Sequence, residues 1–447
     1  MVDPARQAAY EAVAAVHRDD AYANLVLPRI LRELRLDGRD AAFATELTYG
    51  TLRTSGTLDA IIAAAAGREV GRIDPPIRDA LRLGAYQLLH TRVPVHAAVT
   101  STVDLVRAVA GPAGTGFANA VMRRIGGQPL DAWIGSIAPS QAADPLGYLA
   151  VAYAHPLWIV RAFAEALHGD LDQTAELLAA DNTPALVHLC ARPGRIGAAE
   201  LAAEVGGEVG RYSPYAVYLP GGAPGELAAL ASGRAHVQDE GSQLAALALA
   251  EAGLDGPDAR WLDLCAGPGG KAALLGALAA GRGVEVTAVE IAPHRAELVR
   301  HAVAGLPVEV IEADGRELDL AGFDRVLVDA PCSGLGSLRR RPESRWRRRP
   351  ADLPPLTRLQ RELLTAAFRA VRPGGLVGYV TCSPHLVETR VTVAEAVRRS
   401  PVPVELVDVR PALPAGVPDL GTGPAVQLWP HRHGTDAMHI ALLARRG

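Results

Sequence analysis

The chain has 447 residues, a formal net charge of -4 at pH 7, and four cysteines, at positions 190, 265, 332 and 382. The charge excludes a globally basic nucleic-acid-binding protein, and the lack of any Cys-x-x-Cys pair argues against a zinc ribbon or a thioredoxin-type redox site. The few thiols, and the lack of a signal-peptide-like or membrane-length apolar run, favour a cytoplasmic protein that does not span a membrane.

Residues 1–135 predict an all-helical domain. Apolar residues recur there at spacings of three and four, and breakers such as Ser55-Gly56 and Gly111-Pro112 separate the periodic segments. Because the connections are short, we expect the helices to pack as one compact bundle. The predicted helices cover residues 10–16, 25–34, 43–52, 58–66, 77–89, 97–109 and 117–125.

Residues 136–234 predict a small α/β subdomain that links the bundle to the C-terminal domain. Prolines at positions 139, 145 and 156 mark the end of the regular helical pattern of the first domain. Helices are expected at residues 158–167 and 171–180, and strands at residues 186–189 and 216–219.

Residues 235–447 predict an α/β domain with a Rossmann-like, doubly wound and mainly parallel sheet, because strand and helix patterns alternate. The predicted strands cover residues 260–264, 285–290, 308–312, 325–328 and 375–381, and the clearest helices cover residues 271–278, 294–303, 356–370 and 387–397. Late strands at residues 402–407 and 438–443 could close one edge. Open sheets of this kind bind ligands at the carboxyl ends of their strands, so site residues are expected there.

A glycine loop follows the first strand of this domain, in the string Cys265-Ala266-Gly267-Pro268-Gly269-Gly270-Lys271. Glycines let a ligand approach backbone N–H groups, and the N-terminus of the following helix favours negative charge. Glu290, which ends the next strand, suits two ribose hydroxyls. The loop alone does not separate a nicotinamide dinucleotide from S-adenosylmethionine, and a turn without a ligand also stays open.

Lys271 is the one lysine among 45 basic residues, the other 44 being arginines. Lysine is a compact point charge, whereas arginine is a broad delocalised fork. Its retention inside the glycine loop indicates a geometric need for lysine, with chance as the alternative.

Two more acids stand at strand ends, Asp314 after residues 308–312 and Asp329 before Pro331-Cys332. Taken singly, either acid could be a helix cap or a solvated turn residue. Together with the loop and Glu290, they could hold the adenine, the ribose and the methionine amine of a cofactor.

Cys332 and Cys382 also follow apolar runs at strand ends, in the strings Asp-Ala-Pro-Cys-Ser-Gly and Thr-Cys-Ser-Pro. A thiolate can add to C6 of a pyrimidine and turn its weakly nucleophilic C5 into an enamine, which divides one hard step into easier ones. Lys271 is the candidate cation that would favour such a thiolate. By contrast, Cys190 and Cys265 are expected to be small buried packing residues.

These strings together resemble the RNA cytosine-5 methyltransferases, and within them the bacterial small-subunit ribosomal RNA methyltransferase B group. The matching strings cover residues 238–243, 267–271, 329–334 and 381–384. Members of that group carry an N-terminal helical domain similar to antitermination factor B, and residues 46–53, 81–87 and 119–124 match it. The resemblance spans nearly the whole chain.

The resemblance implies a methyl transfer from S-adenosylmethionine to C5 of a cytosine in small-subunit (16S) ribosomal RNA. It implies that Cys382 adds to C6, that Cys332 assists product release by removing the C5 proton, and that Asp329 holds the cytosine edge. Lys271 is implied to act at the same site. The implied cofactor pocket is formed by Cys265, Ala266, Gly267, Pro268, Gly269, Gly270, Lys271, Glu290, Asp314 and Asp329, and no metal is implied.

The chain departs from the family pattern at two places. Ala272 stands after the loop lysine where the family usually has threonine, and Asp436-Ala437-Met438-His439 replaces the usual Asp-Gly-Phe-Phe. The second departure leaves the role of Asp436 open. Neither departure touches the two thiols.

The RNA partner is expected to be naked or partly assembled small-subunit RNA, and the default oligomeric state is a monomer. Residues 339–349 hold seven arginines, one acid and Trp346, which suits phosphate contact and base stacking, although a solvated loop would look the same. The helical domain could be a second RNA contact or a docking module.

Three other functions account for the sequence less completely. A nicotinamide oxidoreductase would explain the loop and Glu290 but not the thiols. A non-catalytic RNA-binding or antitermination protein would explain the bundle and the arginines but would give the thiols no role. A methyltransferase acting on protein or on a small molecule would need neither the bundle nor two cysteines.

Overall fold

The computed structural model describes residues 2–222 and 224–447, which form two compact units. The helical unit comprises the chain up to Pro184 together with Leu338–Arg348. The sheet unit comprises Ala185–Ser337 and Arg349–Gly447. The polypeptide therefore leaves the sheet unit after Ser337, contributes eleven residues to the helical unit, and returns at Arg349.

This division differs from the predicted boundaries at residues 135 and 234. The helices α8 (Pro145–Ala152), α9 (Leu157–Ala166) and α10 (Leu171–Asn182) belong to the helical unit, because α8 and α10 pack against its central helix α3 (Gly38–Ala66). The prolines of this region thus mark connections between helices of one unit and not a change of core.

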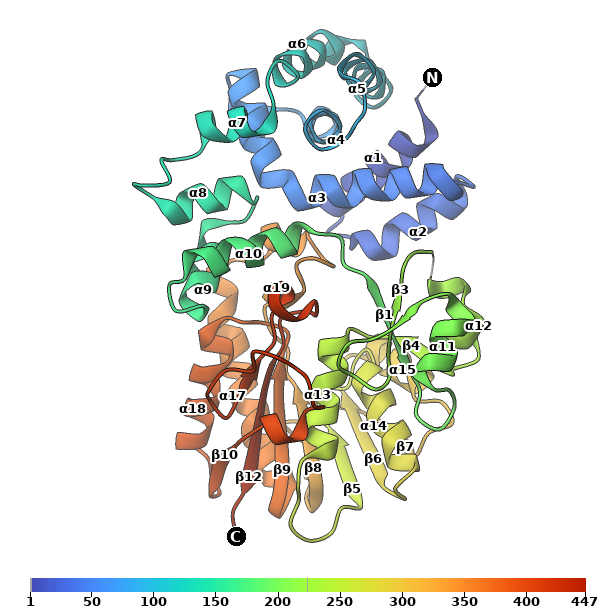
Figure 1. The fold of residues 1–447 in the computed structure, drawn as a ribbon, viewed down its shortest axis with the longest axis vertical. Coiled ribbons are helices and arrows are strands. Elements are labelled where there is room, and N and C mark those ends of the chain that lie inside the picture. The colour runs from blue at the N-terminus through green and yellow to red at the C-terminus, as the bar shows by residue number, and fades with distance from the viewer. Residues whose placement is uncertain (1, 223) are drawn as a thin grey trace. The chain divides into compact units, whose positions relative to one another are not determined.

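The helical unit contains α4 (Pro75–His90) and α5 (Val95–Ala110) beside α3 (Figure 1). Its apolar stripes are buried mainly in a large cluster that includes these helices, and a smaller cluster joins the first two helices to α3. Side chains such as Leu47, Ile61, Leu81 and Met122 are almost completely buried, as the three- and four-residue spacing predicts. The remaining helices before α8 are α1 (Pro4–Arg18), α2 (Ala23–Glu33), α6 (Thr115–Ile125) and α7 (Leu130–Ile137).

The predicted break at Ser55-Gly56 is wrong, because α3 runs through it without interruption. The Ser55 hydroxyl donates back to the Thr51 carbonyl over 2.8 Å, which satisfies it inside the helix. A Cβ at Gly56 would lie 2.2 Å from the Trp346 ring, so glycine at this position admits that ring instead of ending the helix. Tertiary packing here overrides the weak local propensity.

Leu338–Arg348 forms part of the helical core. Arg345 is fully buried and donates to the Arg53 carbonyl over 2.8 Å, to the Asp181 carbonyl over 2.7 Å, and to Asn182 Oδ1 over 2.7 Å. Arg347 donates in turn to backbone carbonyls of α1 and of the α1–α2 connection. The prediction that this run contacts RNA is therefore wrong for Arg345, since a guanidinium enclosed by protein acceptors cannot reach a phosphate.

The sheet unit begins with a small antiparallel sheet, in the order β2-β3-β1-β4. Its strands are β1 (Val187–Ala191), β2 (Glu208–Val209), β3 (Ala216–Leu219) and β4 (Ala235–Val237), and the helices α11 (Ala198–Val205) and α12 (Ala228–Ala231) accompany them. The expected small α/β module is confirmed for this part of the chain.

The main sheet has the strand order β10-β12-β9-β8-β5-β6-β7, with β11 paired to β12. β5, β6, β7, β8 and β9 run parallel, while β12 lies antiparallel to β9 and to β10, so the predicted mainly parallel sheet is confirmed. The strands are β5 (Arg260–Asp263), β6 (Glu285–Glu290), β7 (Val308–Glu312), β8 (Phe323–Asp329), β9 (Val371–Thr381), β10 (Val404–Val407), β11 (Val426–Gln427) and β12 (His439–Arg445).

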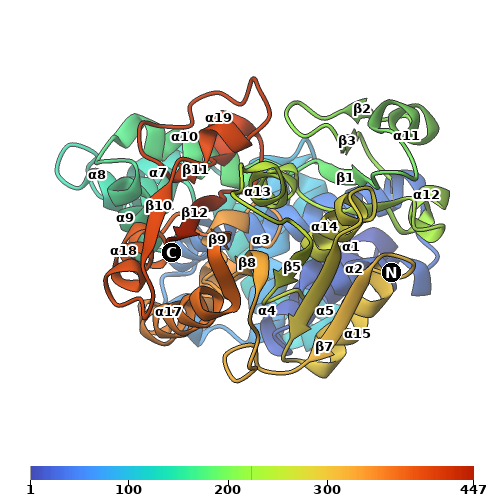
Figure 2. The ribbon, with the colours of Figure 1, turned by 90° about the horizontal axis from the view of Figure 1, so that it is seen from below.

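Helices cover both faces of this sheet, as Figure 2 shows. α13 (Glu240–Glu251), α14 (Gly270–Ala280) and α15 (Pro293–Ala302) pack on one face, and α17 (Leu353–Ala370) and α18 (Arg390–Arg398) pack on the other. The apolar strands are thus buried on both sides, as a doubly wound sheet requires. Among residues 2–222 and 224–447, no helix combines the length and the apolar character needed to cross a membrane.

Candidate active site

Four neighbouring strands of the main sheet end at one edge and carry the predicted site residues. β5 leads into the glycine loop, β6 ends at Glu290, β8 ends at Asp329, and β9 ends at Thr381, the residue before Cys382. Because these strands run parallel, their carboxyl ends meet at the same edge. Motifs that are far apart in the sequence therefore lie together at one edge of the sheet.

Glu290 holds the glycine loop in place. The Gly267 N–H donates to Glu290 Oε2 over 3.0 Å, and the Ala292 N–H donates to Glu290 Oε1 over 2.9 Å. A Cβ at Gly267 would lie 2.3 Å from that carboxylate, and a Cβ at Gly269, where φ is +110°, would lie 2.7 Å from Ala302 Cβ. Both positions therefore require glycine. Contact of Glu290 with a ribose stays a prediction.

Lys271, in the first turn of α14, forms an ion pair with Asp329 at the end of β8. Its Nζ donates to Asp329 Oδ2 over 2.8 Å, and the lysine side chain is only 9% exposed. Burial by itself would lower the pKa of Lys271, but the charge and the hydrogen bond of Asp329 hold that pKa above its ordinary value. The ammonium is therefore protonated and fixed at the strand edge.

The two predicted thiols meet at the ends of β8 and β9. Cys332 Sγ lies 3.4 Å from Cys382 Sγ, and both cysteines are free. Two backbone hydrogen bonds continue the strand pairing around them, from Ala330 N–H to the Val380 carbonyl and from Gly336 N–H to the Cys382 carbonyl, each over 2.9 Å. The expectation that both sulfurs reach one site agrees with this geometry.

The surroundings of the two sulfurs are electrostatically unequal. Their mutual hydrogen bond lowers the pKa of Cys382 and raises that of Cys332, and burial acts to raise both. The Lys271 charge also lowers the pKa of Cys382, against the opposing charges of Asp329 and Asp436, whereas the Glu388 charge raises the pKa of Cys332. The surroundings therefore favour the thiolate form at Cys382 more than at Cys332.

Asp314 follows β7 and is engaged by a neighbouring arginine. Arg316 Nε donates to Asp314 Oδ1 over 3.0 Å, and the same guanidinium pairs with Glu362. The hydrogen bond from Arg316 lowers the pKa of Asp314. The structure thus assigns this carboxylate a cation partner of its own, and a contact with a cofactor stays a prediction.

The two remaining cysteines lie in apolar surroundings. Cys190 is completely buried in β1, which confirms its predicted packing role. Cys265 packs against the core on the α17 side of the sheet, and burial raises the pKa of its thiol well above the usual range. Neither thiol is activated as a nucleophile in these surroundings.

Two acids escaped the sequence prediction. Asp263 ends β5 and is fully buried, and its Oδ2 has no hydrogen-bond partner among the described residues. Burial, with a smaller contribution from Asp329, raises the pKa of Asp263 to about 7. Glu388 is also fully buried and accepts hydrogen bonds from the loops of both thiols. Asp263 could have been predicted, because it is an acid inside the apolar run Trp261–Leu264. No local sequence pattern indicates a role for Glu388.

These residues fit the predicted S-adenosylmethionine. The glycine loop brings backbone close to the carboxylate of Glu290, where a Cβ would collide, and the unsatisfied oxygen of Asp263 can accept a hydrogen bond. Carboxylates at adjoining strand ends supply acceptors for ribose hydroxyls and for an ammonium group. The edge therefore has the donor and acceptor set that this molecule needs.

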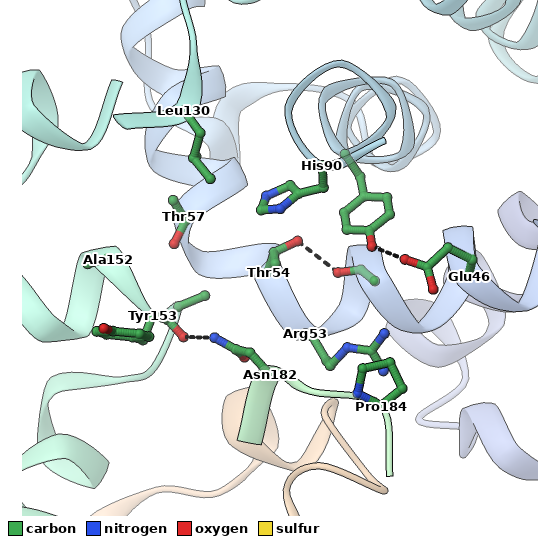
Figure 3. A pocket seen from close by; sticks show the side chains of 13 residues that line it. Glu46, Arg53, Thr54, Thr57, His90, Leu130, Ala152, Tyr153, Asn182 and Pro184 are labelled. Carbon is green, nitrogen blue, oxygen red and sulfur yellow. Dashed lines mark hydrogen bonds between the residues drawn. The ribbon is translucent and has the colours of Figure 1, made fainter. Parts of the chain in front are cut away.

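A hollow of about 190 Å³ lies within the helical unit (Figure 3). Tyr86 donates to Glu46 from one wall, and the ring of His90 stacks on Tyr86 with centroids 5.0 Å apart. The Thr54 hydroxyl is satisfied by the Gly50 carbonyl over 2.7 Å. Because these polar groups bond to one another, the hollow does not by itself identify a ligand.

Comparison with known families matches both parts of the chain. Residues 254–444 match the family model described as 16S rRNA methyltransferase RsmB/F, and residues 3–126 match the NusB family. The first match covers the glycine loop, both thiols and the acids of the site. The second covers most of the helical unit.

Individual relatives extend over nearly the full length. The candidate methyltransferase Rv1407 of Mycobacterium tuberculosis is 57% identical over 99% of this chain and 97% of that protein. Ribosomal RNA small subunit methyltransferase B of Pseudomonas putida is 32% identical over 90% of each chain. Among solved structures, PH0851 superposes with a TM-score of 0.81 at 24% identity, covering 100% of this chain and 99% of that one, which shows a shared fold.

Proposed function

Because the chain belongs to the RsmB/F family of S-adenosylmethionine-dependent RNA (cytosine-5)-methyltransferases, we propose that its substrate is small-subunit (16S) ribosomal RNA. The product is then 5-methylcytosine in that RNA. The relative from Pseudomonas putida, which is named for this substrate, supports the proposal. We also propose that the enzyme acts in the cytoplasm, where it meets ribosomal RNA, and that it is a monomer.

The observation that carries the catalytic proposal is the 3.4 Å separation of Cys332 Sγ and Cys382 Sγ at neighbouring strand ends. A single thiol near a strand end would be compatible with packing. Two thiols in contact, with a lysine beside one and an acid beneath the other, fit a reaction that makes and later breaks a covalent bond.

Cys382 acts as the nucleophile. Its sulfur adds to C6 of the cytosine, and the electron pair of the C5=C6 bond makes C5 nucleophilic. When bound, S-adenosylmethionine would supply the electrophilic methyl group for C5, and the electron pair of the broken S–CH3 bond would stay on the sulfur of S-adenosylhomocysteine. Asp329, which accepts a hydrogen bond from Lys271, holds the amino edge of the base, and the Lys271 charge lowers the pKa of Cys382.

Cys332 completes the reaction. Cys332 first loses its S–H proton to solvent. As a thiolate it then takes the C5 proton, the electrons of the C5–H bond restore C5=C6, and Cys382 leaves as a thiolate. A thiol with a raised pKa has a strongly basic thiolate, which suits the removal of a proton from carbon. The distance between the sulfurs allows both to reach adjacent carbons of one ring.

The cofactor and RNA contacts are assigned on the same basis. Glu290, Asp314, Asp329 and residues 265–271 form the cofactor side of the site. The substrate cytosine is unpaired or extruded from a helix, since a stacked base cannot reach thiols inside a protein. The NusB-like match of residues 3–126 supports the helical unit as the RNA-binding part.

Transfer of a tritiated methyl group from S-adenosylmethionine to RNA tests the proposal. Naked 16S RNA, partly assembled 30S particles, 23S RNA and transfer RNA are offered in parallel, and modified cytosines are mapped by bisulfite sequencing. We expect label in 16S RNA alone, most in the naked or partly assembled form. Label in 23S or transfer RNA instead would contradict the substrate assignment while leaving the chemistry intact.

A further inference from the structure

Glu388 lies beneath both thiol loops and joins them. It is the last residue of the short helix Leu386–Glu388 and is completely buried. Its Oε1 accepts the Ser333 N–H over 2.7 Å, and its Oε2 accepts the Ser383 hydroxyl over 2.7 Å and also the Ser333 hydroxyl. Ser333 directly follows Cys332, and Ser383 directly follows Cys382, so one carboxylate fixes the residue after each thiol.

The same residue is anchored by α17 through its carboxylate and by the sheet through its backbone carbonyl. Gln360 of α17 donates to Glu388 Oε1 over 3.2 Å and to the Pro331 carbonyl over 2.9 Å, which ties the start of the Cys332 loop to the same point. Tyr379 of β9 donates to the Glu388 carbonyl over 2.6 Å. The two serine hydroxyls also lie within hydrogen-bond distance of each other, at 3.1 Å.

Burying a carboxylate costs several kcal/mol unless hydrogen bonds compensate, so a buried acid of this kind is either well satisfied or functionally required. Here the donors are neutral groups that belong to the two thiol loops and to α17. Arranged in this way, the carboxylate fixes the separation of the loops more firmly than serine–serine contact would. Its charge also raises the pKa of Cys332.

We propose that Glu388 is a positioning residue, which sets the sulfur–sulfur geometry and directs the proton of the pair onto Cys332, leaving Cys382 as the thiolate. This inference deepens the proposed function and rests on it for the assignment of nucleophile and base. In this proposal the Lys271 charge lowers the pKa of Cys382, and the Glu388 charge raises the pKa of Cys332.

Thiol reactivity without RNA tests this directly. The reduced full-length enzyme is treated with iodoacetamide across a pH series, and labelling of Cys332 and Cys382 is measured separately by peptide mass spectrometry. In the wild type Cys382 is labelled first as pH rises. In Glu388→Gln we expect the ratio of Cys382 to Cys332 labelling to fall about tenfold, because the charge that raises the pKa of Cys332 is lost.

Two further variants guard against misfolding. Ser333→Ala removes one hydroxyl donor and should shift the ratio in the same direction by a smaller factor. Glu395→Gln, which neutralises a partly exposed acid of α18 that pairs with Arg361, should leave the ratio unchanged. Binding of S-adenosylmethionine, measured by calorimetry, verifies that each variant is folded.

A second readout uses RNA. Glu388→Gln should lower kcat with little change in KM and should accumulate a denaturant-resistant RNA–protein adduct, because a misplaced Cys332 releases product slowly. An unchanged labelling ratio in folded Glu388→Gln and Ser333→Ala would overturn the positioning role. Since the labelling test needs no RNA, it stands apart from the proposed function, which fails if Cys382→Ala still methylates RNA.

Discussion

Lys271 donates to the Asp329 carboxylate over 2.8 Å, and its charge is also near enough to Cys382 to lower the pKa of that thiol. One ammonium serves both partners because it is a compact charge with three donors on a flexible stem. A guanidinium would spread the same charge over a plane. We therefore propose that this geometry is the reason why a chain that otherwise uses only arginine keeps a lysine here.

Replacing Lys271 with methionine should raise the pKa of Cys382, because the nearby cation is lost. The thiolate fraction then falls at every pH below the new pKa, so the iodoacetamide profile of Cys382 moves to higher pH. Methyl transfer should fall by about 10²–10⁴-fold at neutral pH, the usual range for a group that sets a catalytic protonation state. Lys271→Arg is the matched control, and unchanged turnover in that variant would show that the geometry of lysine is not needed.

Cys382→Ala should abolish methyl transfer while binding of S-adenosylmethionine persists, because only the C6 adduct is lost. Cys332→Ala should instead form the adduct and fail to release it. Denaturing electrophoresis after incubation with RNA and cofactor distinguishes the two, since only Cys332→Ala should give a shifted band. A shifted band from Cys382→Ala would reverse the assignment of the two thiols.

Arg345→Met should destabilise the helical unit. The change leaves the carbonyls of Arg53 and Asp181 and the side-chain oxygen of Asn182 without their buried donor. Each such group costs about 1–3 kcal/mol, so the free energy of unfolding should fall by about 3 kcal/mol or more. Calorimetric unfolding measures this, with the exposed Arg39→Met as control. Equal stability of the two variants would contradict the structural role of Arg345.

Two helical glycines should respond oppositely to alanine. Gly56→Ala places a Cβ 2.2 Å from the Trp346 ring, whereas Gly135→Ala in α7 places one in open space. Alanine is favoured over glycine in a helix by about 1 kcal/mol, so Gly135→Ala should stabilise the protein by roughly that amount. Gly56→Ala should destabilise it by about 1–3 kcal/mol, as overpacking does. Stabilisation by both would show that the ring moves aside freely.

Much of the catalytic half could be predicted from the sequence because its signals are local. The strands at residues 285–290 and 308–312 agree with β6 and β7, and the motifs after β5, β8 and β9 meet because parallel strands end at one edge. Glu388 could not be found in this way. It stands in a short helix without periodicity, and its partners Ser333 and Gln360 are remote in sequence.

In the helical unit, the sequence predicts the helices but not the contacts that complete their core. Its helices follow from apolar spacing, but the arginine run after Cys332 looks like a surface patch until its partners are known. Arg345 bonds to the Arg53 carbonyl across 292 positions of sequence, and no local pattern reports such a contact. The sequence shows only that these residues are charged. The buried position of Arg345 in the structure shows that this residue stabilises the fold.

The eleven residues Leu338–Arg348 have a consequence for biosynthesis. As the ribosome makes the chain from its N-terminus, α1 to α10 emerge first, but the donors that complete their core emerge only with Arg345 and Arg347. At about 5–20 residues per second, the first unit waits on the order of ten to thirty seconds in an unfinished state. The rate at which residues 185–337 are translated therefore governs how long that unfinished state is exposed to chaperones and proteases.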